Sequence, residues 1–297
     1  MNILVAGASG LIGRALTQSL SDGRHEVCRL VRRDARESDE IAWDPATGVL
    51  NADDLTGFDA VVCLSGEEIA DSRWSPSKRK RILESRVDSV RVLSDALAKS
   101  VSPPGVFVCA SAIGCYGIEH GDTRLDESSG VGDDFLAEVC RDWEGAAGSL
   151  SGTDVRVVHL RLGIVLSREG GALAKMLLPF RLGLGGKLGS GRQWMSWVGL
   201  SDVVRAIIFA IEDEGVSGAV NVTAPNPVRN VEFTRSLAKS LHRYAPFTIP
   251  GFVIRMVLGE MGELLLLNGA CVIPEKLLER GFEFEHTNID DGLKELV

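Results

Sequence analysis

Three glycines near the amino terminus are the first residues whose type and spacing suggest chemistry. Gly7, Gly10 and Gly13 lie in MNILVAGASGLIGRAL, after a short apolar run and before a helix-like segment. In this setting the glycines permit a tight turn, close backbone approach to a pyrophosphate, and packing of the helix on the strand. The free N–H groups of the helix start favour a negative charge. The loop therefore predicts a dinucleotide site, and a plain strand–helix turn is the alternative. The residues expected to form the site are Gly7, Ser9, Gly10, Leu11, Ile12 and Gly13.

Two arginines follow the second strand-like run, in the sequence RLVRRDARE. NAD-binding folds usually carry an acidic residue here, which bonds the ribose hydroxyls. The guanidinium groups of Arg32 and Arg33 instead suit a 2′-phosphate, which takes paired cationic donors. We therefore expect NADP(H) as the cofactor. Asp34, two positions later than usual, leaves NAD open, and a solvated basic turn is the other alternative.

Further cofactor contacts are expected where other strand-like runs end. Residues 59–64 and 106–109 read as buried strands, and the carboxyl ends of parallel strands meet at one edge of a sheet. Small residues there would let the cofactor approach the backbone. The predicted contacts are Leu64, Ser65, Gly66 and Ala110.

A proton donor is harder to find, because the chain has only two tyrosines, Tyr116 and Tyr244. Tyr116 follows the run 106–109, and its phenol could donate a proton if a neighbouring cation lowered its pKa. Ser111 could orient a substrate oxygen. The alternative is that Tyr116 packs against its loop. Asp134, Glu138 and Cys140 are weaker candidates, since charged residues on a helix face are usually solvated and a thiol nucleophile needs a cationic neighbour.

Composition narrows the class of protein. The chain has 297 residues and a net charge of -9, which disfavours nucleic acid and anionic membranes as partners. No apolar run reaches the length of a membrane span, and no signal peptide is evident. Six scattered cysteines indicate reduced, buried thiols in a cytoplasmic protein. No histidine or cysteine spacing indicates a metal, and no G-x-S-x-G elbow is present.

Strand-like and helix-like segments alternate along the chain, with helices expected over 11–20, 75–97 and 135–149. This predicts an α/β protein with a Rossmann-like, doubly wound parallel sheet and a smaller C-terminal substrate lobe. We expect a dinucleotide-binding domain over 1–165, which receives a strand and a helix from about 198–224. Residues 166–297 form mainly the lobe and a C-terminal module, and the Gly-rich stretch 182–194 reads as a long loop.

Two other stretches allow two interpretations each. Arg73 and the run Lys78, Arg79, Lys80 and Arg81 form a basic cluster, which is either a solvated helix start or an anion-binding rim. Trp194 and Trp197 flank the Gly-rich stretch. They either stack on a ligand or anchor the lobe to the core.

The segments GASGLIG, ASAIGCYG (110–117) and LRLGIVLS (160–167) resemble the extended short-chain dehydrogenase/reductase superfamily. Residues 65–87, 189–207 and 274–293 are similar to its atypical epimerase-family group, the NAD-dependent epimerase/dehydratase-like proteins with their own C-terminal domain. The resemblance implies NADP(H)-dependent oxidoreductase or epimerase-type chemistry on a small polar substrate. It leaves the substrate, partners and oligomeric state open.

The chain departs from that superfamily at its Tyr-x-x-x-Lys pair, which relays a proton to the substrate oxygen. Leu136 falls where the tyrosine would be and Cys140 where the lysine would be, while Glu144 matches an acidic residue that often follows. The chemistry would then need a different acid and base. The competing hypothesis is a non-catalytic NADPH-binding protein that reports the cofactor level to a partner.

Overall fold

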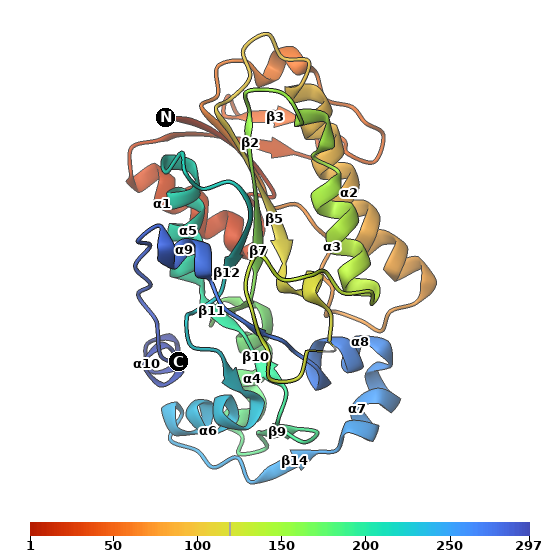
Figure 1. The fold of residues 1–297 in the computed structure, drawn as a ribbon, viewed down its shortest axis with the longest axis vertical. Coiled ribbons are helices and arrows are strands. Elements are labelled where there is room, and N and C mark those ends of the chain that lie inside the picture. The colour runs from red at the N-terminus through yellow and green to blue at the C-terminus, as the bar shows by residue number, and fades with distance from the viewer. Residues whose placement is uncertain (119) are drawn as a thin grey trace.

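The computed structural model describes residues 1–118 and 120–297. Its centre is a seven-stranded parallel sheet in the order β12-β7-β5-β4-β1-β2-β3 (Figure 1). The strands are β1 (Asn2–Ala6), β2 (Glu26–Val31), β3 (Glu40–Ala42), β4 (Ala60–Cys63), β5 (Val106–Ala112), β7 (Arg156–Leu162) and β12 (Gly218–Val222). The order reverses beside β1, and this reversal opens a crevice at the carboxyl edge.

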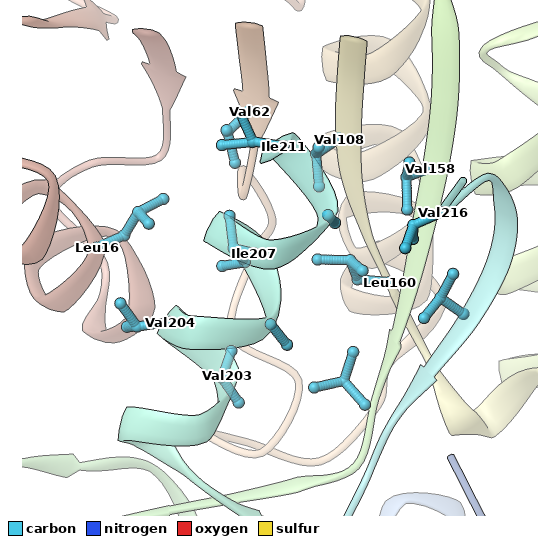
Figure 2. Close-up of a cluster of buried hydrophobic side chains, with 14 of the residues drawn as sticks. Leu16, Val62, Val108, Val158, Leu160, Val203, Val204, Ile207, Ile211 and Val216 are labelled. Carbon is cyan, nitrogen blue, oxygen red and sulfur yellow. The ribbon is translucent and has the colours of Figure 1, made fainter. Parts of the chain in front are cut away.

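Helices cover both faces of this sheet, as the near-continuous apolar strands require. On one face lie α1 (Leu11–Asp22) and α5 (Leu200–Glu212), and on the other α2 (Pro76–Leu97) and α3 (Phe135–Gly145). Figure 2 shows Leu16 and Ile207 meeting Val62 and Val108 on the α1/α5 side. The neighbouring Val61 points to the other core, because successive strand residues alternate between faces.

The helix boundaries follow local chemistry. The Ser75 hydroxyl accepts the Lys78 N–H, and Pro76 occupies the first turn of α2, as the sequence indicated. The helix expected over 135–149 is shorter. It ends at Gly145, and a separate 3₁₀ turn, η3 (Gly148–Leu150), follows. Two glycines in four residues lower the helix propensity there, which explains the error.

Much of the chain after β7, apart from α5 and β12, forms a lobe below the carboxyl edge (Figure 1). The expectation of one long loop over 182–194 is wrong, because β9 pairs with β14 and β10 pairs with β13. Three short elements lie in the first part of the chain: η1 (Ala52–Leu55), η2 (Ile113–Tyr116) and β6 (Arg124–Leu125). The remaining elements of the later part are β8 (Ile164–Ser167), α4 (Gly171–Arg181), β9 (Gly186–Leu188), β10 (Trp194–Met195), β11 (Trp197–Gly199), β13 (Val228–Arg229), α6 (Asn230–Ser240), β14 (Phe247–Ile249), α7 (Gly251–Leu258), α8 (Glu260–Gly262), η4 (Glu263–Leu267), β15 (Cys271–Val272), α9 (Glu275–Glu279) and α10 (Ile289–Leu296).

Within the described residues, no helix is both long and apolar enough to cross a membrane. All six thiols are free. Cys28 is partly exposed and the other five are buried. The strand and helix that the sequence assigned to about 198–224 are β12 and α5, and both belong to the central sheet and its covering layer.

Candidate cofactor and active site

The glycine loop lies between β1 and α1, and two of its glycines are required by close packing. Gly7 has a φ of +84°, and a Cβ there would lie 2.7 Å from the Leu64 carbonyl carbon. A Cβ on Gly13 would lie 2.2 Å from the Gly7 carbonyl oxygen. At Gly10 the nearest such atom is 3.4 Å away, an ordinary contact. Gly7 and Gly13 are thus required by packing, whereas Gly10 has room for a side chain.

The loop leaves donors facing that space. The Gly10 N–H bonds the Gly7 carbonyl oxygen at 3.0 Å, and α1 begins at Leu11. The N–H groups of the first helical residues, Leu11, Ile12 and Gly13, have no intrahelical acceptor, as at any helix start. Arg14 adds a cation, with Nη1 2.6 Å from the Ser9 carbonyl oxygen. These groups can hold a pyrophosphate. Arg14 belongs to no motif of the sequence, and only its position in the structure indicates a role.

The two arginines after β2 differ in their contacts. The Arg33 guanidinium donates to both carboxylate oxygens of Glu40, at 2.6 and 2.8 Å. The hydrogen bonds from Arg33 hold the pKa of Glu40 at about 2. Arg32 is exposed and forms no ion pair with any described residue. The Arg32 guanidinium is therefore available to an anion, whereas Arg33 already bonds Glu40.

Only some of the other predicted cofactor residues lie against the glycine loop. The Leu64 N–H extends the ladder to Ala6 at 2.9 Å, and the backbone of Leu64 and Ser65 forms the wall against Gly7. Gly66 lies farther along, beneath the Arg86 guanidinium. Ala110 is buried inside β5, which continues to Ala112 rather than ending at 109. Leu64 and Ser65 thus contact the loop directly, and Ala110 does not end its strand.

Ser111 and Tyr116 meet in one polar network at the ends of β5 and β7. The Ser111 hydroxyl donates to Glu144 at 2.7 Å, and Arg161 donates to both Glu144 oxygens at 2.9 Å. Arg161 also donates to the Tyr116 hydroxyl at 3.1 Å, and that hydroxyl donates to Asn221 at 2.7 Å. Ser111, Tyr116, Arg161 and Asn221 are buried. The network joins α3 to β5, β7 and β12.

This environment does not activate the phenol. Arg161 is the neighbouring cation that the sequence analysis required, but burial outweighs it and raises the pKa of Tyr116. Burial also acts to raise the pKa of Glu144, yet hydrogen bonds from Arg161 and Ser111 lower it below its usual value. The ground state is therefore a neutral phenol beside an ion pair. Tyr116 reaches a substrate only if this network opens.

The positions of the missing Tyr and Lys are filled without replacement chemistry. Leu136 packs in an apolar cluster with Phe135, Trp74 and, from the C-terminal segment, Leu264. The Cys140 thiol donates to the Ala112 carbonyl oxygen at 3.5 Å, and burial raises its pKa to about 12. Asp134 caps α3 through the N–H groups of Leu136 and Ala137. These contacts are structural.

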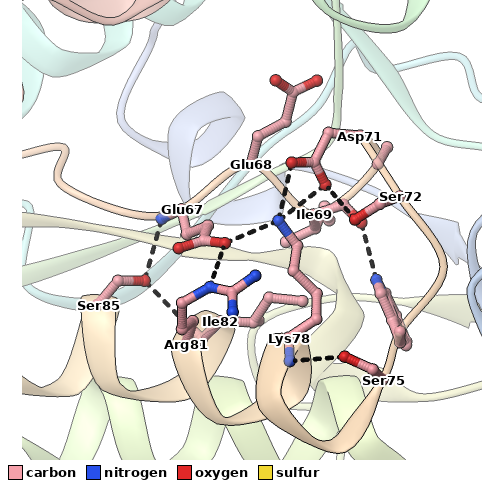
Figure 3. A network of polar contacts seen from close by, with 12 residues as sticks. Glu67, Glu68, Ile69, Asp71, Ser72, Ser75, Lys78, Arg81, Ile82 and Ser85 are labelled. Carbon is pink, nitrogen blue, oxygen red and sulfur yellow. Dashed lines mark hydrogen bonds and ion pairs between the residues drawn. The ribbon is translucent and has the colours of Figure 1, made fainter.

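The basic cluster after the fourth strand is largely neutralised (Figure 3). Lys78 is buried, and its Nζ lies 2.8 Å from Glu67 and 2.7 Å from Asp71. Arg81 shares Glu67, and Arg79 pairs with Glu260 of the C-terminal lobe. The cluster is therefore neither a solvated helix start throughout nor a free anion rim. It fixes residues 65–75 against α2 and ties α2 to α8.

The two tryptophans have different settings. Trp197 is fully buried, and its indole N–H bonds the Asn226 carbonyl oxygen at 3.2 Å. Trp194 is partly buried beneath the Arg229 guanidinium, 3.7 Å from the ring centroid. Trp197 therefore anchors the lobe. Trp194 forms a cation–π contact within the lobe.

The lobe closes on the glycine loop through α4. Cβ atoms on Gly170 and Gly171 would lie 3.4 and 3.6 Å from the Leu11 side chain. Lys175 reaches across to Glu68 at 2.5 Å and to the Ala70 carbonyl oxygen. The space over the loop is thus bounded by both parts of the chain, as in open α/β sheets that bind ligands at the carboxyl edge.

The fold and loop define a Rossmann-fold protein of the extended short-chain dehydrogenase/reductase type. Comparison with protein families matches residues 3–223 to the NAD dependent epimerase/dehydratase family. Residues 249–296 match a domain of unknown function, DUF1731. The chain belongs to this epimerase/dehydratase family, which confirms the resemblance found in the sequence.

Known proteins resemble the chain over its whole length. An epimerase family protein of Mycobacterium leprae is 41% identical, over 98% of this chain and 94% of the relative. The crystal structure of human epimerase family protein SDR39U1 with NADPH has a TM-score of 0.92 and 36% identity, covering 100% of this chain and 99% of that one. A nucleoside-diphosphate sugar epimerase from Corynebacterium glutamicum has a TM-score of 0.83 and 34% identity, covering 100% of this chain and 58% of that one.

Proposed function

We propose that the chain binds NADP(H) above the glycine loop and acts as an oxidoreductase on a small polar substrate. The observation that carries this proposal is the open Gly10 position beside unpaired helix N–H groups, with Arg32 exposed after β2. The human relative crystallised with NADPH supports the same cofactor. Six free thiols support a reducing compartment such as the cytoplasm.

The bound cofactor would supply or accept a hydride at the nicotinamide. The chain's own part is to bind the pyrophosphate with the loop, the 2′-phosphate with Arg32, and to exclude water with the C-terminal lobe. Ser111, Glu144, Arg161 and Tyr116 form the polar network nearest the carboxyl ends of β5 and β7. With all of its hydrogen bonds formed, the network holds the side chains of Ser111, Arg161 and Tyr116 in fixed positions at this edge of the sheet. Turnover on ordinary carbonyl substrates should be slow, because the site lacks the usual Tyr-Lys pair and the Tyr116 phenol is not activated. General acid–base help of that kind is worth about 10²- to 10⁴-fold in rate.

A second candidate function is NADPH binding without catalysis. The observation that favours it is that Leu136, at the position of the usual tyrosine, and Leu264 of the C-terminal segment pack against the same buried cluster of Ile82, Phe135 and Val139. A lobe packed in this way could report the bound cofactor to a partner.

Screening NADPH oxidation over a panel of carbonyl compounds separates the two functions. The wild type should bind NADPH and oxidise it slowly with some panel members, and Tyr116→Phe should lower that rate. Tyr244→Phe is the matched control, because Tyr244 is 90% exposed in the lobe. Tight NADPH binding without oxidation by any panel member would favour the binding-only function, and failure to bind NADPH would refute both.

A further inference from the structure

The C-terminal lobe exposes large apolar side chains at its far end. They come from the end of α4, the link to β9, β14 and α7, and Phe252 and Met256 are each 67% exposed. We call these residues the distal patch: Leu178, Leu182, Leu184, Phe247, Ile249, Phe252, Met256 and Val257. Exposed apolar groups gathered in this way mark interaction surfaces.

The elements that carry the distal patch are neighbours. In the parallel pair β9·β14, Phe247 lies opposite Gly186. The Arg243 side chain bonds the Arg181 carbonyl oxygen at 3.1 Å, which joins the segment before β14 to the end of α4. Cβ atoms on Gly189 and Gly251 would both meet Leu267, which joins β9 to α7. Figure 1 shows β9, β14 and α7 together at the end of the molecule opposite the N-terminus.

The charge of these segments differs from that of the whole chain. Residues 170–193 and 240–259 contain no Asp or Glu, although the net charge of the chain is -9. Two of their cations are neutralised from outside, Lys175 by Glu68 and Arg255 by Glu263. The others form no ion pair with any residue that the structure describes: Arg181, Lys187, Arg192 and Arg243.

We propose that the distal patch docks on an anionic lipid surface. Exposed Phe, Leu and Met side chains would enter the headgroup region, and the unpaired cations would meet the lipid phosphates. A symmetric contact with a second copy would instead bring the same cations face to face. The total charge led us to expect no membrane partner, but it hides this cationic segment. The chain would lie on the bilayer without spanning it.

Flotation of the full chain with vesicles tests this proposal. We expect binding to equimolar phosphatidylcholine–phosphatidylglycerol vesicles, weakened by added salt, and much weaker binding to phosphatidylcholine alone. Phe252→Glu should reduce binding by roughly ten- to a hundred-fold, because it removes an inserted ring. Val101→Glu is the matched control, since Val101 is 90% exposed before β5, at the other edge of the sheet. Arg181→Gln should reduce binding by about fivefold, and Lys99→Gln should not.

Circular dichroism and thermal unfolding of each variant separate loss of docking from loss of fold. No binding to anionic vesicles would overturn the proposal. So would equal binding to neutral vesicles, or equal binding by folded Phe252→Glu and wild type. A dimer in sedimentation experiments that Phe252→Glu dissociates, without vesicle binding, would assign the distal patch to a second copy instead.

Discussion

The glycine loop and the Ser111–Glu144–Arg161–Tyr116 network lie at the same edge of one sheet, yet they use polar groups in opposite ways. The loop leaves the N–H groups at the start of α1 without intrahelical acceptors, and Arg32, after β2, forms no ion pair with any residue that the structure describes. The network satisfies its own side chains, with Glu144 taking three hydrogen bonds from Ser111 and Arg161. Unpaired donors at a surface are prepared for a ligand, whereas a closed buried network stabilises the fold. The groups available to a ligand therefore lie in the loop, and the groups that stabilise the fold lie in the network.

The largest effects should come from the loop glycines. Gly13→Val places a side chain 2.2 Å from the Gly7 oxygen, so we expect loss of the fold and of NADPH binding. Gly10→Val is the matched variant, because its Cβ has room at 3.4 Å. It should fold normally and bind NADPH at least a hundredfold more weakly by calorimetry. Unchanged affinity in Gly10→Val would reduce the loop to a simple turn.

Breaking the network should mainly affect stability. Arg161→Met leaves Glu144 without its partner, and removing one member of a buried pair costs about 3–5 kcal/mol. Urea unfolding measures this loss. NADPH affinity should change far less than in Gly10→Val. An equal fall in affinity in a still folded Arg161→Met protein would show that the two regions are one site.

Cofactor choice should depend on Arg32 more than on Arg33. Arg32→Ala should lose roughly 1.5 to 3 kcal/mol of NADPH binding, a ten- to hundred-fold change, and leave NADH binding unaltered. Arg33→Ala should change the preference less, since that guanidinium bonds Glu40. Titration of both variants with both cofactors decides this. A larger effect of Arg33→Ala would reverse the assignment.

Tyr116→Phe should destabilise the fold by about 1 kcal/mol, because it removes the hydroxyl from Asn221 and Arg161. Thermal unfolding checks the size of the effect. An unchanged unfolding free energy together with a lost reductase rate would make Tyr116 a catalytic residue rather than a positioning one.

The network should also give a small acid dependence. Because the folded pKa of Glu144 is lowered, its contribution to stability is present above the unfolded value, about 4.3, and is lost as pH falls through the folded value. Urea midpoints between neutral and acid pH should fall more steeply in wild type than in Glu144→Gln. Parallel profiles would show that Glu144 does not carry this dependence.

Much of this fold was predictable from the sequence because it depends on short-range patterns. The buried strands, the glycine loop and the Ser75–Pro76 helix start follow from apolar runs and local chemistry. The network could not be predicted in the same way. Arg161 and Tyr116 are 45 positions apart, and only the pairing of β5 with β7 brings them together. The ion pair between Arg33 and Glu40 depends on the short strand β3, which begins at Glu40 and was not expected from the sequence.

Calorimetric titration of the wild-type chain with NADPH and with NADH tests the central claim most directly. The account predicts measurable NADPH binding, at least tenfold tighter than NADH binding, because Arg32 meets the 2′-phosphate that NADH lacks. Equal affinities, or tighter binding of NADH, would contradict it.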